Sequence, residues 1–239
     1  MAKLYHLFFA IVIMISLIMC SDQSSNETSL IPKEGLQAFL NFDGDANDMS
    51  GKGNHGTLLG NAVASGSLVT GNNAADALSL PFSVLDGLID FSFTAWIKIN
   101  TFRNQSHELI SGANAIEDNV LIIWYSETAD KWFMGINDGS SEFSSDSRME
   151  DGTWHHIAIT RAGDNARLYL DGAIIGSPVS VGEDQLDIEA GGLIFGQDQD
   201  ALGGSFHLDD SWAGEIDNLR LYNRSLSGKE VQAIADEEH

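Results

Sequence analysis

Short apolar segments of alternating polarity, separated by turn-forming residues, run through this chain from about Leu36 almost to its end. A period of two residues is typical of a strand that buries one face. Many short strands without intervening helices predict an all-β fold, a sandwich of two antiparallel sheets. Nine strands are predicted: Gln37–Phe42, Ala77–Leu80, Ser92–Asn100, Val120–Tyr125, Trp132–Ile136, His155–Arg161, Ala166–Leu170, Gly192–Phe195 and Glu215–Tyr222.

Two local signals add detail to this fold. Asp171-Gly172 lies between two apolar segments and predicts a hairpin tip, because Asp-Gly suits the turns that match strand twist. Ser227 with Glu230 three residues later forms a capping-box sequence, followed by Val231 and Ile234 on one face. One short helix is therefore expected at the C-terminus, and no second domain is indicated.

The N-terminus has the features of an export signal. Lys3 supplies the positive charge, residues 7–19 form an apolar run too short for a comfortable membrane span, and Cys20 is the only cysteine. This arrangement resembles a bacterial lipoprotein signal, although Met19 departs from the small residue usual before the cysteine. We expect a signal peptide over residues 1–20, lipidation of Cys20, a polar tether over 21–34 and a folded domain over 35–239.

This leader predicts an exported protein, anchored by its lipid at the bacterial cell surface or in the periplasm, with ordinary secretion as the alternative. The charge balance limits the other partners. Twelve Lys and Arg against 35 Asp and Glu give a formal net charge of −23, so the surface repels nucleic acid and anionic membranes. We therefore expect no nucleic-acid partner, and membrane contact only through the lipid anchor. Such acidity also suits divalent cations.

A glycine-bounded loop holds the most suggestive acidic residues. Asp198 and Asp200 are two residues apart, with Gln199 between them, and Asp210 follows ten residues after Asp200. In an extended loop the two carboxylates point the same way, and calcium accepts mixed carboxylate, amide and carbonyl ligands. An isolated Asp-x-Asp sequence in an acidic chain is more often a solvated loop, so the loop alone does not establish a site.

Several segments resemble bacterial laminin-G-like domains of the concanavalin A-like lectin superfamily. They are residues 42–48 (FDGDAND), 51–57 (GKGNHGT), 153–158 (TWHHIA) and 214–224 (GEIDNLRLYNR). These segments span nearly the whole chain behind the leader. The resemblance implies a jelly-roll sandwich.

A narrower resemblance is to the pentraxins, a branch of that superfamily. Residues 196–206 (GQDQDALGGSF) resemble the calcium loop of pentraxins, and residues 117–124 (EDNVLIIW) resemble their other calcium segment. The resemblance implies a first calcium ion with ligands from two segments: Asp118, Asn119, Asp198, the Gln199 carbonyl and Asp200. It also implies that Asp198 and Asp200 bridge to a second ion beside Asp210.

Two departures from the pentraxin pattern qualify this expectation. His207 falls where pentraxins have another carboxylate ligand, and imidazole is a poor ligand for a hard cation, which leaves the second ion open. The paired cysteines of pentraxins are also absent, since Ala95 stands at one of their positions. That absence weakens any claim of shared assembly, and the oligomeric state stays open.

A surface calcium with open coordination positions can bind sugar hydroxyls or phosphate oxygens. The resemblance places Trp124 beside such a ligand, where an indole face could stack on a sugar or hold a quaternary ammonium; core packing is the alternative. The predicted function is a calcium-dependent module that binds carbohydrate or phosphorylated ligands at the cell surface without catalysis. The alternatives are a glycan-degrading enzyme and an adhesion domain in which calcium only rigidifies loops.

The enzyme alternative depends on Glu215 and Asp217, which resemble the start of the carboxylate motif of laminarinase-type hydrolases. Those enzymes need a further Glu on the same strand face as general acid. Strict alternation puts Leu219 and Leu221 there, so the acid is missing. His155 and His156 are adjacent on a predicted strand and face opposite sides, so a shared metal is not expected. One ring is expected inward and hydrogen-bonded, the other solvated.

Overall fold

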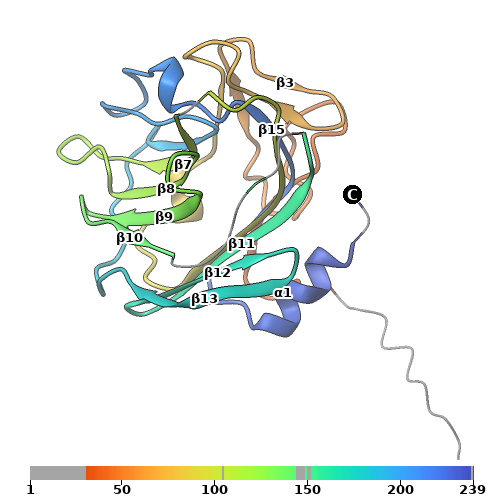
Figure 1. The fold of residues 1–239 in the computed structure, drawn as a ribbon, viewed down its shortest axis with the longest axis vertical. Coiled ribbons are helices and arrows are strands. Elements are labelled where there is room, and N and C mark those ends of the chain that lie inside the picture. The colour runs from red at the N-terminus through yellow and green to blue at the C-terminus, as the bar shows by residue number, and fades with distance from the viewer. Residues whose placement is uncertain (1–30, 104, 144–148, 150–151, 238) are drawn as a thin grey trace, which may run out of the picture.

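Two antiparallel β-sheets pack face to face, and one short helix lies outside them (Figure 1). The computed structural model describes residues 31–239 except 104, 144–148, 150–151 and 238. The predicted leader, Cys20 and most of the predicted tether lie outside the described residues. The all-β class and the two-sheet jelly-roll architecture are confirmed.

The eight-stranded sheet, sheet A, contains the longest strands. Its order is β13 (Ala173–Ser180), β12 (Asn165–Leu170), β11 (His155–Ala162), β6 (Phe91–Ile99), β15 (Gly214–Tyr222), β4 (Leu68–Val69) and β3 (Val63–Ala64), with β1 (Leu36–Leu40) also pairing with β15. The seven-stranded sheet, sheet B, runs β10 (Ser141–Glu142), β9 (Lys131–Ile136), β8 (Leu121–Ser126), β7 (Ser106–Gly112), β14 (Leu193–Phe195), β5 (Ala77–Ser79) and β2 (Thr57–Leu59).

All nine predicted strands form, with ends that differ by no more than two residues. The structure adds six more: β2, β3, β4, β7, β10 and β13. Most of these are short or lie at a sheet edge. The longer β7 has no regular alternation, since six of its seven residues are buried, and this explains why its sequence does not read as a strand.

The main core lies between the sheets because alternate residues of each strand point inward. Phe93, Ala95 and Ile97 of β6 face Leu121 and Ile123 of β8 across the core, and all five are fully buried. Ala95 is thus part of an apolar layer where pentraxins have a cysteine. The domain is held by apolar burial instead of a disulfide at this position.

A second, smaller core lies under the helix α1 (Gly228–Ala235). Ser227 accepts a hydrogen bond from the Glu230 backbone, and the Glu230 carboxylate accepts one from the Ser227 backbone, which confirms the capping box. Val231 and Ile234 are buried against Tyr169 and Tyr222 on the outer face of sheet A. Among the described residues, no helix is both long and apolar enough to cross a bilayer.

The predicted hairpin tip joins β12 to β13. Asp171 and Gly172 both have positive φ, at 50° and 77°, which is the geometry of the turns that follow strand twist. The Asp171 carboxylate accepts hydrogen bonds from the His156 backbone and pairs with the His155 ring, each at 2.9 Å. The turn therefore also fixes the start of β11.

Candidate functional site

The outer face of sheet B carries the predicted ligand-binding side chains. Along β8, burial alternates, and Ile122 and Trp124 point away from the core. Trp124 lies opposite Phe133 of β9, and their rings stack with centroids 4.9 Å apart and planes 10° apart. Trp124 therefore belongs to a surface aromatic pair, and its core-packing alternative is wrong.

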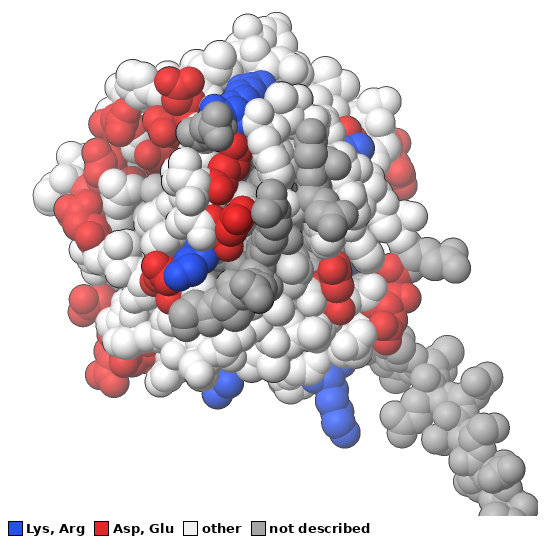
Figure 2. Space-filling view, in the orientation of Figure 1, with Lys and Arg blue, Asp and Glu red and all other residues white. Residues whose placement is uncertain are grey.

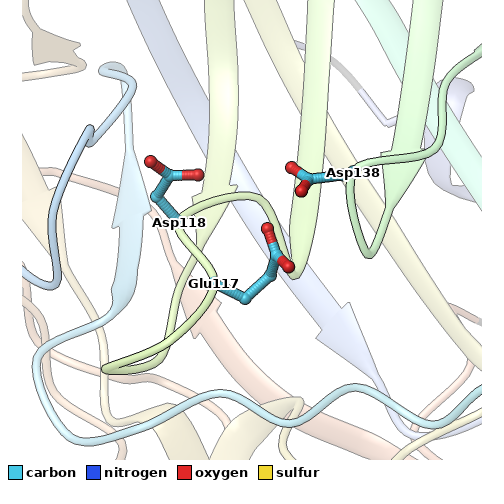
Figure 3. A group of neighbouring side chains, drawn as sticks. All are labelled: Glu117, Asp118 and Asp138. Carbon is cyan, nitrogen blue, oxygen red and sulfur yellow. The ribbon is translucent and has the colours of Figure 1, made fainter.

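Three carboxylates meet at one end of this face. Glu117 and Asp118 lie in the loop before β8, and Asp138 lies in the turn after β9. One oxygen from each lies within 4.8 Å of the others, and the side chains of Glu117 and Asp138 point toward one another (Figure 3). Hydrogen bonding to Asp138 raises the pKa of the Glu117 carboxyl above its usual value, and the negative charge of Asp138 adds to this. Such crowding favours a cation or a shared proton.

Asn119 completes this group. Its Nδ2 donates to Asp118 Oδ1 at 3.1 Å, whereas its Oδ1 is buried without a hydrogen-bond partner. A buried amide oxygen without a partner is costly, and a cation can satisfy it. Carboxylates with an amide oxygen are the donor set that calcium prefers, so these residues fit that ion.

A shallow hollow lies beside Asn119 on the same face. Its volume is about 160 Å³, and it is lined by Asn119, Ile122, Trp124, Asp138, Gly139 and Ser140. Its size suits a head group or part of one sugar, since pockets for larger ligands usually exceed about 300 Å³. The predicted ligand contact Trp124 and the predicted calcium residue Asn119 thus line one hollow.

The glycine-bounded loop is anchored by its buried amide side chains. Gln199 Nε2 donates to the Ser111 hydroxyl at 3.0 Å and to the Gly192 carbonyl at 2.8 Å, and Gln199 Oε1 accepts from Gly203 N at 2.7 Å. Gln197 Nε2 donates to the Ala74 carbonyl at 2.7 Å. These bonds fix the Gln199 side chain inward, so only its backbone carbonyl remains as the predicted ligand.

The carboxylates of this loop repel a buried neighbour that the sequence did not reveal. Glu108 of β7 is 5% exposed, and burial followed by the charges of Asp210 and Asp198 raises its pKa well above the usual value. Burial also raises the pKa of Asp198 and of Asp210, and the charge of Asp200 adds to both. The Ser111 hydroxyl is hydrogen-bonded to Asp198. These residues form an acidic group in which burial and mutual repulsion raise the pKa of Glu108, Asp198 and Asp210.

The structure presents the predicted ligands as two groups. Over the described parts of the chain, Glu117, Asp118 and Asp138 form the single set of three acidic, His or Cys side chains with all ligand atoms within 4.8 Å. Asp198, Asp200 and Asp210 act on one another electrostatically without closing to that distance as a set. The His207 ring lies 3.2 Å from Asp200, so this imidazole pairs with one predicted ligand.

Three acidic residues of this region were missed. Glu117 directly precedes a predicted ligand, and Asp138 was read only as part of an Asp-Gly turn, so both had a signal in the sequence. Glu108 had none, because its strand was not predicted. Figure 2 shows acidic side chains gathered on the left of the molecule, the side where β7–β10 lie in Figure 1, with few basic ones.

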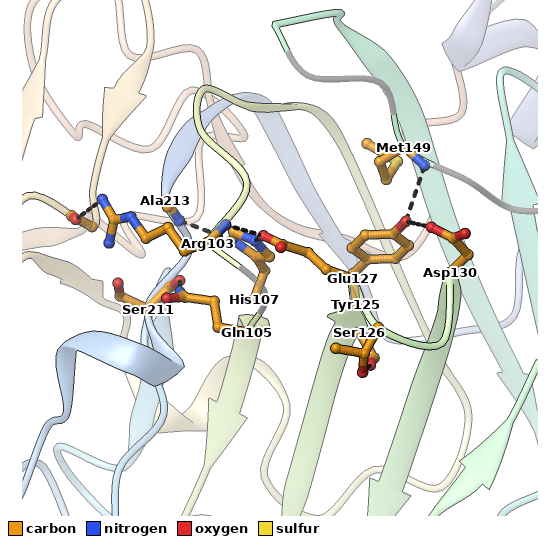
Figure 4. Close-up of polar contacts among 12 residues, drawn as sticks. Arg103, Gln105, His107, Tyr125, Ser126, Glu127, Asp130, Met149, Ser211 and Ala213 are labelled. Atoms are coloured by element: carbon orange, nitrogen blue, oxygen red, sulfur yellow. Dashed lines mark hydrogen bonds and ion pairs between the residues drawn. The ribbon is translucent and has the colours of Figure 1, made fainter.

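A polar network at the start of β7 links this strand to residues 211–213 (Figure 4). The buried His107 ring pairs with Glu127 through Nε2 and accepts from Ala213 N at 3.3 Å through Nδ1. Gln105 Nε2 donates to the Ser211 carbonyl at 3.3 Å. Because Glu108 and Asp210 are adjacent in sequence to two of these residues, the network fixes their separation.

Of the two carboxylates of the hydrolase-like motif, Glu215 is paired with a lysine, whereas burial raises the pKa of Asp217 to about 6. Glu215 lies 2.8 Å from Lys98 Nζ and accepts from the Ser67 hydroxyl at 2.7 Å, and these contacts lower its pKa against the effect of its burial. The predicted face of Leu219 and Leu221 is wrong, because an irregularity after Asp217 turns both into the core. Arg220 takes the outer position instead. A cation stands where a general acid would be needed.

The two adjacent histidines differ partly from expectation. His155 is half-buried and pairs with Asp171, whereas His156 is fully buried with both ring nitrogens unpartnered. Its ring lies on the outer face of sheet A, edge-on to Trp96 at 5.6 Å between centroids. His155 thus provides the expected hydrogen-bonded ring, whereas the expectation that the other ring is solvated is wrong, because His156 is fully buried. Burial lowers the pKa of His156 to about 4, so the ring is neutral.

Comparison with known proteins agrees with this architecture. The curated relatives include Sushi, von Willebrand factor type A, EGF and pentraxin domain-containing protein 1 of Rattus norvegicus, 27% identical over 160 residues, or 64% of this chain and 4% of that protein. C-reactive protein 1.1 of Limulus polyphemus is 26% identical over 154 residues, 63% of each chain. The chain thus spans less than two thirds of either relative.

Solved structures show the same fold. A heptameric SAP-like pentraxin from Limulus polyphemus aligns with a TM-score of 0.57 and 24% identity over 64% of this chain and 72% of its own. Domain 4 of AbnA, an arabinanase of Geobacillus stearothermophilus in complex with arabinotriose, aligns with a TM-score of 0.61 and 20% identity over 84% and 98%. The model of the concanavalin A-like lectin/glucanases superfamily matches residues 70–232, and the chain belongs to that superfamily.

Proposed function

We propose that this protein is a calcium-dependent binding module for carbohydrate or phosphorylated ligands, without catalysis. The hollow lined by Asn119 and Trp124 carries the proposal. It joins an unpartnered amide oxygen and three crowded carboxylates to an aromatic pair on one exposed face. An ion held there would keep coordination positions open toward the hollow.

The first ion would be held by Asp118 and Asn119 from the group beside the hollow and by Asp198, the Gln199 carbonyl and Asp200 from the glycine-bounded loop. Glu117 and Asp138 would be further carboxylates beside it. A bound calcium supplies a positive charge that attracts phosphate or sugar oxygens. The chain's own residues do the rest: Trp124 offers an apolar face to a sugar ring or to a quaternary ammonium, and Ile122 forms the apolar wall beside it. The small volume of the hollow means that only the terminal sugar or head group of a larger ligand would enter it.

One solved structure of the same fold supports the carbohydrate branch. Relatives of this chain are named C-reactive proteins and pentraxins, and the arabinanase domain of the same fold was solved with an arabinose trimer. Calcium titration by calorimetry, followed by a glycan and phospholipid-head-group array with calcium and with chelator, tests the proposal. We expect array signals that chelator removes and that Asp118→Ala reduces. Signals that persist in chelator would contradict it.

The outer position of Arg220 after Asp217 favours binding over hydrolysis, because a guanidinium cannot act as the general acid that the hydrolase motif needs there. Release of reducing ends from arabinan or β-glucan, lost in Glu215→Gln, would support the enzyme alternative instead. An adhesion domain with a purely structural ion would melt at a higher temperature in calcium and give no array signal.

We also propose that the protein is exported and anchored through a lipid on Cys20, with residues 21–34 as a tether. The lone cysteine after an apolar run supports this. Incorporation of labelled palmitate into the wild type, and its loss in Cys20→Ser, is the expected result in a bacterial host. A heptameric relative of the same fold makes an oligomer worth testing by light scattering, with and without calcium.

A further inference from the structure

We propose that Glu108 is a ligand of a second calcium ion, together with Asp198 and Asp210. It would supply the carboxylate that this chain lacks at His207. The inference rests on the proposed calcium function and deepens it. It assigns a metal ligand to a strand that has no part in the resemblance to the pentraxin calcium segments.

The first argument is that one carboxyl oxygen of Glu108 is buried without a partner. Its side chain is 5% exposed, and Oε2 is buried with no hydrogen-bond partner. The two charged groups that act on it most strongly are the carboxylates of Asp210 and Asp198. A buried carboxylate facing two others requires a proton or a cation, since an isolated negative charge loses its hydration when it is buried.

The second argument is that the fold aims Glu108 at the ion-binding face. Glu108 lies opposite Trp124 and Ser111 lies opposite Ile122, so both share the outer face with these side chains. Residues three apart on a regular strand would face opposite sides. A β-bulge between Glu108 and Ile110 restores both to the outer face, and bulges commonly re-aim side chains beside functional sites.

The third argument is that the surrounding contacts fix the group. Glu108 forms an isolated parallel bridge with Ser211, next to Asp210. Ser111, on the same strand, bonds to both Asp198 and the Gln199 amide. Glu108 therefore lies beside the segment that carries Asp210, and Ser111 links the same strand to the loop that carries Asp198. His207 pairs with Asp200, on the exposed side of the loop.

The test is to count calcium ions bound to the chelator-treated full-length protein by calorimetry and native mass spectrometry. We expect two ions in the wild type, one in Glu108→Gln, and one in Asp118→Asn. The exposed Glu183→Gln is the matched control and should keep two. The double variant Glu108→Gln/His207→Glu should regain the second ion, because it restores a carboxylate at the pentraxin position.

A melting measurement separates ligation from a structural role. Glu108→Gln removes a buried repulsive charge, so we expect its melting temperature without calcium to rise by a few degrees, while its gain on adding calcium shrinks. Two ions in Glu108→Gln, or one ion in the wild type that Glu108→Gln leaves in place, would overturn the assignment and leave the proposed function standing. No calcium binding by the wild type would contradict the proposed function itself.

Discussion

The outer faces of the two sheets differ in whether their charged side chains have partners of opposite charge. On sheet A, helix α1 covers the face, Arg224 pairs with Glu230, and Arg220 pairs with Glu237. On sheet B, the outer face carries no α-helix among the described residues, and Glu108 meets only like charges among its strongest neighbours. On sheet A these charged side chains are paired within the chain, whereas no cation is among the described groups that shift the pKa of Glu108 on sheet B. A buried carboxylate that faces only like charges is a candidate for a functional site.

The largest expected effect tests the outer face of sheet A, which helix α1 covers. Ile234→Ala removes a fully buried side chain under α1 and should cost about 2–4 kcal/mol of unfolding free energy. Urea denaturation in calcium and in chelator should give the same loss. Ile122→Ala, at a half-exposed position on the outer face of sheet B, is the matched control and should cost about 1 kcal/mol. A calcium-dependent loss for Ile234→Ala would break the distinction between the faces.

The second effect is a pH dependence from His156. Burial lowers the pKa of His156 to about 4, from 6.5 in the unfolded chain. Between these two pH values the ring is protonated in the unfolded chain and neutral in the folded one. Stability from the neutral ring is therefore present above pH 6.5 and lost as the pH falls toward 4, up to about 3 kcal/mol. The difference in unfolding free energy between wild type and His156→Phe, measured from pH 7 to 4, should show this slope. A flat difference would refute it.

The third effect belongs to the face of sheet B. Calcium at about 100 times its Kd should stabilise the wild type by about 2.7 kcal/mol. Asp198→Asn removes a predicted bridging ligand and should lose most of this gain, while Asp236→Asn, at an exposed position after α1, should keep it. Thermal melts over a calcium series measure both. Equal gains in both variants would remove Asp198 from the ion site.

The smallest effect compares two tryptophans. Trp124→Ala should weaken binding of the strongest array ligand about tenfold, a loss of about 1.4 kcal/mol, because one stacking face is removed. Trp154→Ala, beside Lys98 and His239 over sheet A, should leave that affinity unchanged. Surface plasmon resonance at fixed calcium measures both. An equal loss in both would show that the hollow beside Asn119 is not the binding site.

Much of the fold could be predicted because alternation and turns are local properties. The nine strands, the Asp171-Gly172 tip and the Ser227 cap each depend on residues a few positions apart. The same holds for the pairs Asp118-Asn119 and Asp198-Asp200, which were recognisable as short segments. Strand order was not readable: β6 pairs with β15, more than one hundred residues away. Such pairings depend on how whole faces pack together.

The site shows the same division most clearly at two carboxylates. Asp198 was identified because its chemistry is carried by its immediate neighbours in a loop. Glu108 was not, because β7 lacks regular alternation and a bulge decides which way its side chain points. The sequence by itself therefore determined the all-β class, the elements and the oxygen-rich segments. Only the tertiary structure decided which distant carboxylates share a buried face, since burial and repulsion arise when the sheets and loops assemble.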